Sequence, residues 1–277
     1  MKRIRDIIPY FQSRLSDRFD NREIVSWAYM IIKHIFNYNR SDYILNIDDK
    51  ICNNQCQEII KVVELLSIDH PIQYIIGYSD FLGLKFKVNT DVLIPRPETE
   101  ELVSWILEHS FKTVLDIGTG SGCIAITIAK KTNAHITGMD ISKDCLKIAR
   151  FNARLNHTNV EFIHSNIFNY IRTRKYDLIV SNPPYISESD KSSMKKNVLN
   201  FEPKLALFVP DNDPLVFYNK IIKISKENLN SGGFLFFEIN EKHGHDIVNL
   251  MKAEKFVDIE LKKDLNDKYR MIKGVWK

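Results

Sequence analysis

Residues 116–122 read Asp116-Ile117-Gly118-Thr119-Gly120-Ser121-Gly122, and this run indicates the architecture of the chain. An apolar segment over 113–117 leads into it, and a helical pattern over 122–131 follows directly. Glycines let the backbone adopt positive φ and approach a ligand closely. The first turn of a helix offers free N–H groups to an anion. The pattern therefore predicts a strand, a glycine turn and a helix, with a ligand held at the turn.

Strand and helix patterns alternate along the rest of the carboxyl-terminal part. A helix is expected over 142–155, and apolar runs typical of strands lie at 135–140, 160–163, 177–182, 233–239, 256–261 and 271–276. Such alternation predicts an α/β fold with a mainly parallel, doubly wound sheet and helices on both faces. Ligands of these sheets bind at the carboxyl ends of the strands, which is where the glycine turn lies.

The amino-terminal part has a different pattern. Apolar side chains recur at helical spacing in three segments separated by polar turns at 17–22, 37–42 and 48–54, so we expect a small all-α domain over residues 1–75. Bulky residues alternate between 78 and 88 and predict a β-hairpin, which belongs to a connector over 76–97. The α/β domain is expected over 98–277.

Composition is that of an ordinary globular protein. The 277 residues are 44% hydrophobic and 27% charged, which excludes a disordered tail, a collagen-like chain and a coiled coil. No apolar run approaches the roughly 20 residues of a transmembrane helix, and we expect no signal peptide. Cys52 and Cys56 have no further metal ligands nearby in the sequence. We therefore expect a cytoplasmic protein with reduced thiols, no membrane association and no metal.

The distribution of charge argues against a nucleic-acid partner. The net charge is +4, and residues 1–75 contain 10 basic and 10 acidic side chains. The remainder carries 29 of the 39 basic and 25 of the 35 acidic residues. A dedicated DNA-binding domain usually has a clustered basic face, so no stable DNA partner is expected.

An acidic residue ends the strand that follows the glycine turn. Asp140 lies twenty residues after Gly120, where a carboxylate can accept hydrogen bonds from ribose hydroxyls. The glycine spacing is G-x-G-x-G and not the dinucleotide pattern G-x-G-x-x-G. Asp116 would repel a pyrophosphate but suits an ammonium or sulfonium group. These features favour S-adenosylmethionine over NAD, and a purely structural turn is the competing interpretation.

The segment Asn182-Pro183-Pro184-Tyr185 follows the strand expected at 177–182. Two prolines cannot continue a central strand, so the chain leaves the sheet stiffly at its carboxyl edge. The side-chain carbonyl of Asn182 and the backbone carbonyl of Pro183 can accept both N–H bonds of a planar –NH₂ group, and Tyr185 supplies an aromatic face. Such an arrangement orients a weakly nucleophilic nitrogen toward a sulfonium methyl without a strong base. A plain Pro-Pro turn is the alternative.

The two motifs resemble those of amino-group methyltransferases with the class I Rossmann-like fold. Further stretches narrow the resemblance: PIQYIIG (71–77) with FLGLKF (81–86), IPRPETE (94–100) and EPKLAL (202–207). Together they resemble the bacterial release factor glutamine methyltransferases over nearly the whole chain. The resemblance implies S-adenosylmethionine as cofactor and methylation of the glutamine in the Gly-Gly-Gln motif of class 1 peptide chain release factors. It also implies that the helical domain recognises this protein substrate.

The resemblance assigns roles to individual positions of this sequence. The residues implied to bind the cofactor are Gly118, Thr119, Gly120, Ser121, Gly122, Asp140, Asn166, Ile167 and Asn182. Asn182, Pro183 and Tyr185 are implied to be catalytic. The residues implied to contact the substrate are Asn182, Pro183, Pro184, Tyr185, Phe81, Arg96 and Pro97. Asn166 stands where the family usually has an acid that accepts from the adenine amino group, so we expect weaker adenine binding.

Three other functions fit parts of the pattern. A glutamine methyltransferase acting on a ribosomal protein would share both motifs. An adenine-N6 DNA methyltransferase also uses a site of the Asn-Pro-Pro-Tyr type on a flipped base, but it needs a basic groove. A non-catalytic release-factor-binding module on a decayed enzyme fold would not need the intact glycine turn, Asp140 and Asn182 found here.

Overall fold

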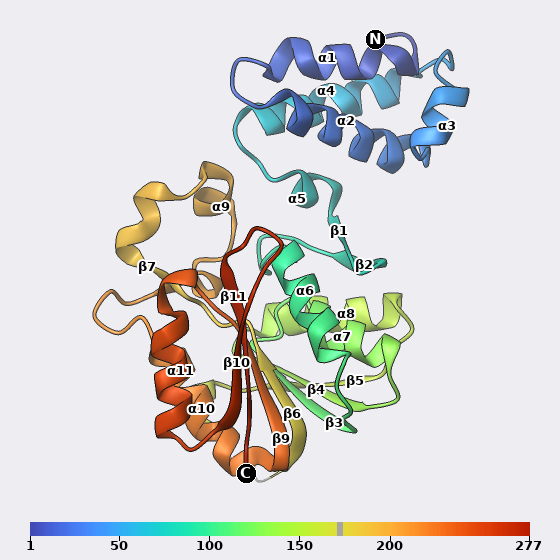
Figure 1. The fold of residues 1–277 in the computed structure, drawn as a ribbon. Helices are drawn as coiled ribbons and strands as arrows, with labels where there is room; N and C mark the ends of the chain where they lie inside the picture. The colour runs from blue at the N-terminus through green and yellow to red at the C-terminus, as the bar shows by residue number, and fades with distance from the viewer. Residues whose placement is uncertain (171–173) are drawn as a thin grey trace. The chain divides into compact units, whose positions relative to one another are not determined.

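The computed structural model describes residues 1–170 and 174–277, which form two compact units. The first unit comprises Met1–Gly77 together with Lys196–Phe201, and the second comprises Tyr78–Lys195 together with Glu202–Lys277 (Figure 1). The polypeptide therefore passes from one unit to the other three times. The functional division of the chain at residues 75 and 97 stays a prediction.

The first unit is all helical within Met1–Gly77. Its elements are η1 (Ile4–Asp6), α1 (Ile7–Leu15), α2 (Asn21–Phe36), α3 (Arg40–Leu45), α4 (Asn53–Ser67) and α5 (Ile72–Ile76). Buried apolar side chains from all of these elements, among them Phe11, Ile31 and Val63, form one core. The predicted helices are present because their apolar positions recur at a spacing that places them on one face.

One predicted turn of the first unit is wrong. The segment 37–42 was expected to be a polar turn, but α3 begins at Arg40 within it. The side chain of Asn39 accepts hydrogen bonds from the N–H groups of Ser41 and Asp42, and the Asp42 carboxylate accepts in return from the Asn39 N–H. Polar residues that suggest a turn here form a capping box that starts a helix.

The second unit is built on a seven-stranded sheet in the order β10-β11-β9-β6-β3-β4-β5. The strands are β3 (Thr113–Ile117), β4 (His135–Asp140), β5 (Val160–His164), β6 (Tyr176–Ser181), β9 (Leu229–Glu238), β10 (Val257–Lys263) and β11 (Tyr269–Val275). The run from β9 to β5 is parallel, and β11 pairs antiparallel with both of its neighbours. The predicted mainly parallel α/β sheet is confirmed.

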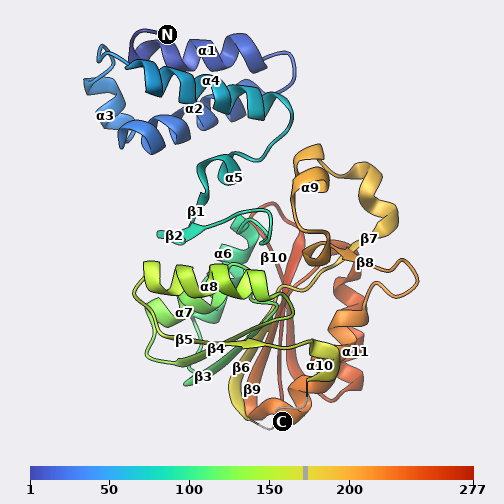
Figure 2. The same cartoon turned by 180° about the vertical axis from the view of Figure 1, so that it is seen from behind.

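Helices cover both faces of this sheet (Figure 2). On one face lie α6 (Pro97–Ile106), α7 (Cys123–Lys131) and α8 (Lys143–Leu155), and on the other lie α10 (Val216–Asn228) and α11 (Gly244–Ala253). Successive residues of β6 point to opposite faces, so Leu178 packs with the first group and Ile179 with the second. The sheet is thus buried on both sides, which explains the nearly continuous apolar strands of the sequence.

The predicted hairpin is present as β1 (Tyr78–Phe81) and β2 (Leu84–Lys87). Its turn uses Gly83 with a φ of +80°. The side chain of Asn152 on α8 fixes the hairpin, because it accepts from the Lys87 N–H at 2.7 Å and donates to the Lys87 carbonyl at 3.0 Å. The side chains of Phe81 in β1 and Phe86 in β2 are buried.

The remaining elements are short. They are η2 (Ile167–Asn169), β7 (Ile186–Ser187), η3 (Glu188–Ser193), α9 (Lys196–Phe201), η4 (Lys204–Ala206), β8 (Phe208–Val209) and η5 (Glu241–His243). The segment 186–201 therefore contains two helical segments and a short strand. In the first unit the Phe201 ring of α9 packs on His70, with ring centroids 4.5 Å apart. None of the described helices has the length and apolar character that a membrane span requires.

Candidate active site

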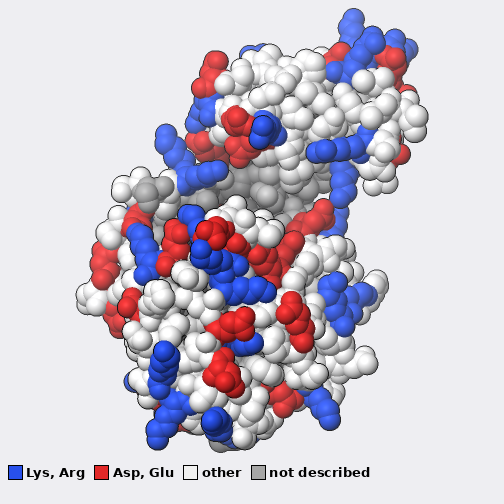
Figure 3. Space-filling model, viewed as in Figure 1, with Lys and Arg blue, Asp and Glu red and all other residues white. Residues whose placement is uncertain are grey.

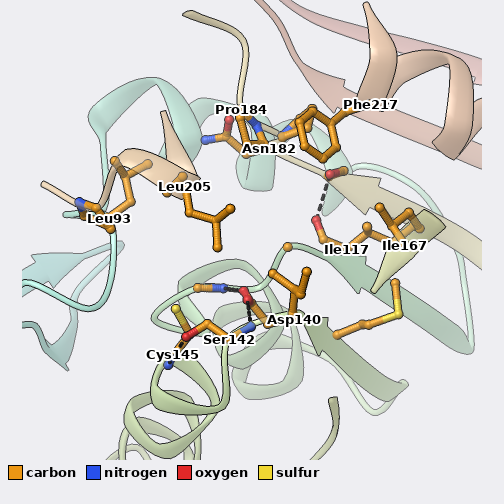
Figure 4. A pocket seen from close by; sticks show the side chains of 18 of the residues that line it. Leu93, Ile117, Asp140, Ser142, Cys145, Ile167, Asn182, Pro184, Leu205 and Phe217 are labelled. Carbon is orange, nitrogen blue, oxygen red and sulfur yellow. Dashed lines mark hydrogen bonds between the residues drawn. The ribbon is translucent and has the colours of Figure 1, made fainter. Parts of the chain in front are cut away.

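A cavity of about 450 Å³ lies in the second unit, where the carboxyl ends of β3, β4 and β6 meet (Figure 4). Its volume is in the range of sites for small molecules and cofactors. Predicted site residues that line it are Gly118, Gly120, Asp140, Asn166, Ile167, Asn182, Pro183 and Pro184. In the view of Figure 4, Asn182 and Asp140 lie on opposite sides of the cavity. The folded chain thus brings the glycine turn and the proline segment to one site.

The glycine turn has the backbone conformation that its sequence predicts. Gly118, Gly120 and Gly122 have φ values of +75°, +54° and +83°, in the left-handed region that favours glycine. The N–H groups of Gly118 and Thr119 both donate to the carbonyl of Met139, which ties the turn to the end of β4. A Cβ on Gly122 would lie 2.7 Å from Cδ1 of Ile126, so the turn also packs tightly on α7.

Asp140 holds the turn and the start of α8 together. Its Oδ2 accepts from the Gly120 N–H at 2.9 Å, and its Oδ1 accepts from the Ser142 N–H at 2.8 Å. Burial raises the pKa of Asp140, and hydrogen bonds from backbone N–H groups, those of Ser142 and Gly120 among them, act against that shift. Each carboxylate oxygen keeps a second lone pair, so Asp140 can still accept hydrogen bonds from a ligand in the cavity.

Apolar side chains line much of the cavity and are unusually exposed for their type. Ile141 is 44% exposed, Phe168 is 42% exposed and Leu205 is 63% exposed. Exposed large apolar groups that converge on a cavity mark a ligand site. Asn166 is the N-cap residue of η2, and its Oδ1 atom accepts a hydrogen bond from the Phe168 N–H at 2.9 Å. Asn166 therefore positions Phe168 as well as lining the cavity itself.

Asn182 lies directly after β6, which ends at Ser181. The preceding Ser181 donates its hydroxyl hydrogen to the Ile117 carbonyl at 2.7 Å, which joins the ends of β6 and β3. The Asn182 Nδ2 group donates to the Thr99 Oγ1 atom at 3.3 Å. The proline segment therefore leaves the sheet from a fixed point, and the amide of Asn182 is held by a side chain from α6.

The other predicted site residues do not line the cavity. Thr119 donates to Asp116 at 2.6 Å, the Ser121 carbonyl accepts from Asn152, and Gly122 caps α7. These three support the glycine turn from within the unit. Phe81 is only 1% exposed and packs edge-on against Phe86, so its side chain stabilises the core and does not face the cavity.

Arg96, Pro97 and Tyr185 also lie behind the cavity surface. Arg96 forms an ion pair with Glu202 at 2.5 Å, just before the lining residues Pro203 and Leu205, and thereby holds that rim segment. Pro97 is the first residue of α6, a position that proline favours. Tyr185 directs its hydroxyl to Glu238 at 3.3 Å and packs against the core.

Two buried groups near the turn have strongly shifted pKa values. Burial raises the pKa of Asp116 from 3.8 to about 7, and the Thr119 hydroxyl acts against this shift. Burial raises the pKa of the lining residue Cys145 to about 11, so this thiol stays protonated at neutral pH. Among the described residues no cluster of His, Cys, Asp and Glu side chains is arranged to hold a metal.

Sequence reasoning missed several residues of the site. Leu93, Asp91, Cys145 and Phe217 line the cavity but come from segments without a recognisable motif. Glu238 was also missed, although its sequence offered a signal. It is the one charged residue at the end of the apolar run 234–239, and a buried acid at the carboxyl end of a central strand suggests a polar site.

Comparison with known proteins assigns the family. Residues 97–201 match the methyltransferase small domain, and residues 6–77 match the PrmC N-terminal domain. The chain is 44% identical over 272 residues to the release factor glutamine methyltransferase of Flavobacterium psychrophilum, covering 95% of each protein. The chain belongs to the release factor glutamine methyltransferase family. Another member, from Bacteroides thetaiotaomicron, is 39% identical over 96% of this chain and 98% of its own length.

Solved structures agree with the fold of this family member. A methyltransferase from Pyrococcus furiosus superposes with a TM-score of 0.55 at 16% identity, covering 81% of this chain and 98% of its own. The Thermus thermophilus 16S rRNA N2 G1207 methyltransferase, solved with AdoMet and guanosine, has a TM-score of 0.51 at 16% identity. The match covers 72% of this chain and 50% of that protein. The expected class I methyltransferase fold is thereby confirmed.

Proposed function

We propose that this chain transfers a methyl group from S-adenosylmethionine to the side-chain amide nitrogen of a glutamine in a peptide chain release factor. The observation that carries the proposal is the convergence of the glycine turn, Asp140 and the Asn182-Pro183-Pro184 segment on one cavity. Membership of the family supports the same activity. The glutamine of the Gly-Gly-Gln motif in class 1 release factors is the proposed acceptor, and the cytoplasm is the proposed location.

The chemistry of the lining fits S-adenosylmethionine. Gly118 and Gly120 expose backbone beside the cavity, Asp140 offers carboxylate lone pairs for ribose hydroxyls, and Ile141 and Phe168 offer apolar surface for a flat base. Asn166 and Ile167 are the proposed adenine contacts, and Thr119, Ser121 and Gly122 support the turn. The bound cofactor supplies an electrophilic methyl group on a sulfonium.

The proposed task of Asn182 and Pro183 is to orient the acceptor amide. An amide nitrogen is a weak nucleophile because its lone pair is delocalised. The Asn182 Oδ1 atom and the Pro183 carbonyl can each accept one of its N–H bonds, which aims the nitrogen and raises its electron density. Such orientation lowers the activation free energy by making the reaction effectively intramolecular. As the carbon–nitrogen bond forms, the bond between the methyl carbon and sulfur would break, and the amide proton would become acidic and pass to water, so no strong base is needed at the start.

Roles for the other implied substrate residues follow from their positions. Arg96 holds the rim segment through Glu202, and Pro97 starts the helix that carries Thr99. Tyr185 contacts Glu238, and Phe81 packs in the core. We therefore propose that these four act by supporting the cavity, while Asn182, Pro183 and Pro184 touch the substrate.

Charge supports a protein acceptor over a nucleic acid. Among the described side chains on the face that Figure 3 shows, basic and acidic groups are interspersed. Phosphate backbones are bound by grouped lysines and arginines. The helical domain, which matches the PrmC N-terminal domain, is the proposed recognition element for the release factor.

The proposal is tested by methyl transfer from labelled S-adenosylmethionine. The acceptors are a purified class 1 release factor, its Gln→Ala variant in the Gly-Gly-Gln motif, ribosomal protein and duplex DNA. We expect label on the wild-type release factor alone. Asn182→Ala should abolish transfer, whereas Asn133→Ala, an exposed asparagine just before β4, should leave it unchanged.

The other outcomes identify the competing functions. Label on ribosomal protein or DNA would keep the chemistry and change the acceptor. Cofactor binding without transfer to any acceptor would indicate a non-catalytic release-factor-binding module, and would contradict the proposal.

A further inference from the structure

A chain of three hydrogen-bonded side chains leads from the cavity into the core. The Asn182 Nδ2 group donates to the Thr99 Oγ1 atom at 3.3 Å, and the Thr99 hydroxyl donates to the Glu238 Oε2 atom at 2.6 Å. Thr99 is 2% exposed and Glu238 is 1% exposed. The residues come from three different elements, because Thr99 belongs to α6 and Glu238 ends β9, while Asn182 follows β6.

The carboxylate of Glu238 is occupied on both oxygens. The Tyr185 hydroxyl donates to Oε1 at 3.3 Å, opposite the Thr99 contact on Oε2. The Tyr218 hydroxyl donates to the backbone carbonyl of Glu238 at 3.1 Å, which fixes the end of the strand. Arg270 contributes its positive charge from β11, although its own hydrogen bonds go to Asp264 and the Ile239 carbonyl.

The direction of these hydrogen bonds follows from the number of protons available. An ionised carboxylate can only accept, so the single Thr99 hydroxyl hydrogen must point to Glu238. The Thr99 oxygen can then only accept from Asn182, and the group facing it must be the Asn182 –NH₂ group. The Asn182 carbonyl oxygen is therefore the end of the amide turned away from Thr99.

We propose that Thr99 and Glu238 are positioning residues that fix the orientation of the Asn182 amide, so that its carbonyl oxygen is presented to the acceptor nitrogen. The inference rests on the proposed function, because an amide flipped by 180° would present donors to an acceptor –NH₂ group. Neither residue touches the reacting atoms. They prevent the Asn182 side chain from rotating by 180° about the bond to its amide carbon, which would exchange the carbonyl oxygen and the –NH₂ group without changing the shape of the side chain.

The surroundings of Glu238 set the conditions for this orientation. Burial raises the pKa of Glu238, and the hydroxyls of Thr99 and Tyr185 and the charge of Arg270 act in the opposite direction. Glu98, one residue before Thr99, adds a like charge that raises the pKa further. A protonated Glu238 could donate to Thr99, so the chain of hydrogen bonds would lose its fixed direction on the acid side.

The test compares two replacements of Thr99 in the transfer assay with a release factor. Thr99→Val keeps the shape but removes the hydroxyl, and we expect kcat/KM to fall about tenfold, mainly in kcat, which corresponds to about 1.4 kcal/mol and lies in the range of a single hydrogen bond. Thr99→Ser restores the hydroxyl and should keep kcat/KM within about threefold of the wild type. Cofactor affinity should be unchanged in both variants. Thr99→Val alone should lower the thermal stability, because it leaves the buried Glu238 Oε2 atom without its donor.

Two further variants make the result specific. Thr127→Val removes a buried hydroxyl that has no hydrogen-bond partner among the described residues, so it should leave kcat unchanged. Glu238→Gln replaces an acceptor with a group that can also donate, and kcat should fall about tenfold even if Thr99→Val fails to fold.

The outcomes that overturn the inference are distinct from failure of the proposed function. Wild-type kcat in Thr99→Val or in Glu238→Gln would show that the orientation of Asn182 does not depend on this chain. Equal losses in Thr99→Val and Thr99→Ser would show that only packing was disturbed. No transfer by the wild type itself would overturn the proposed function, and the inference with it.

Discussion

Replacement of Asp116 by asparagine is expected to remove a pH dependence of stability that the fold imposes on the second unit. The Asp116 side chain is fully buried, and its Oδ1 atom has no hydrogen-bond partner among the described residues. Burial raises its pKa from 3.8 to about 7, and the charge of Asp140 adds to this shift. Between these pH values the folded state keeps a proton that the unfolded chain releases, so stability falls as the pH rises.

The size of the effect follows from the two pKa values. A rise from 3.8 to about 7 corresponds to about 4 kcal/mol of stability lost between acid and neutral pH. An asparagine side chain at this position cannot ionise, so the variant should not lose this stability. As the pH rises, the unfolding free energy of the variant should therefore increase relative to that of the wild type by about this amount. Any constant cost of the buried amide cancels, because only the change with pH is compared.

Urea unfolding at several pH values between about 4 and 8 measures this difference. The three tryptophans are Trp27, Trp105 and Trp276, and a Trp27→Phe background leaves fluorescence only from the second unit. Asp177→Asn is the matched control, because the pKa of Asp177 is lowered from 3.8, so its titration lies below the pH range of the assay and its profile should stay parallel to that of the wild type. Parallel pH profiles for Asp116→Asn and the wild type would falsify the assignment of the proton to Asp116.

Three further changes test other parts of the account. Gly232→Ala should destabilise the second unit by about 1–2 kcal/mol in urea unfolding, because its φ is positive but the space around it is open. Gly122→Ala has a similar positive φ and should cost about 1–3 kcal/mol more than Gly232→Ala, because its Cβ would also overlap Ile126. Equal costs would refute the packing argument. Phe81→Ala should lower the unfolding free energy by about 3–5 kcal/mol yet leave cofactor affinity, measured by calorimetry on folded protein, unchanged. A weakened affinity would instead place Phe81 in the binding site. Asn166→Asp should tighten cofactor binding through a charged acceptor, and an unchanged or raised dissociation constant would remove Asn166 from the adenine contacts.

The sheet was predictable because local sequence and tertiary structure agree there. The strands at 113–117 and 135–140 have the expected bounds, since each is an apolar run that ends at a glycine turn or an acid. The sequence did not reveal α3, because Asn39 and Asp42 suit both a turn and a helix cap. Only the geometry of the folded chain decides between these two uses of the same residues.

The site residues that belong to a sequence motif could be predicted, whereas contacts between segments that are distant in the sequence could not. Asp140 ends β4, and Gly118 and Asn182 directly follow β3 and β6, so the parallel sheet brings them to the same edge. Thr99 and Glu238 are 139 positions apart, and neither lies in a motif that explains the contact. Side-chain pairs of this kind depend on the packing of α6 against β9, which no local pattern specifies.

Mass spectrometry of the release factor after reaction tests the central claim most directly. Peptides that span the Gly-Gly-Gln motif are compared after incubation with S-adenosylmethionine and either the wild type or Asn182→Ala. The account predicts a single added methyl group on the glutamine side chain with the wild type and an unmodified peptide with the variant. A methyl group on another residue, or an unmodified glutamine in a reaction that consumes cofactor, would contradict it.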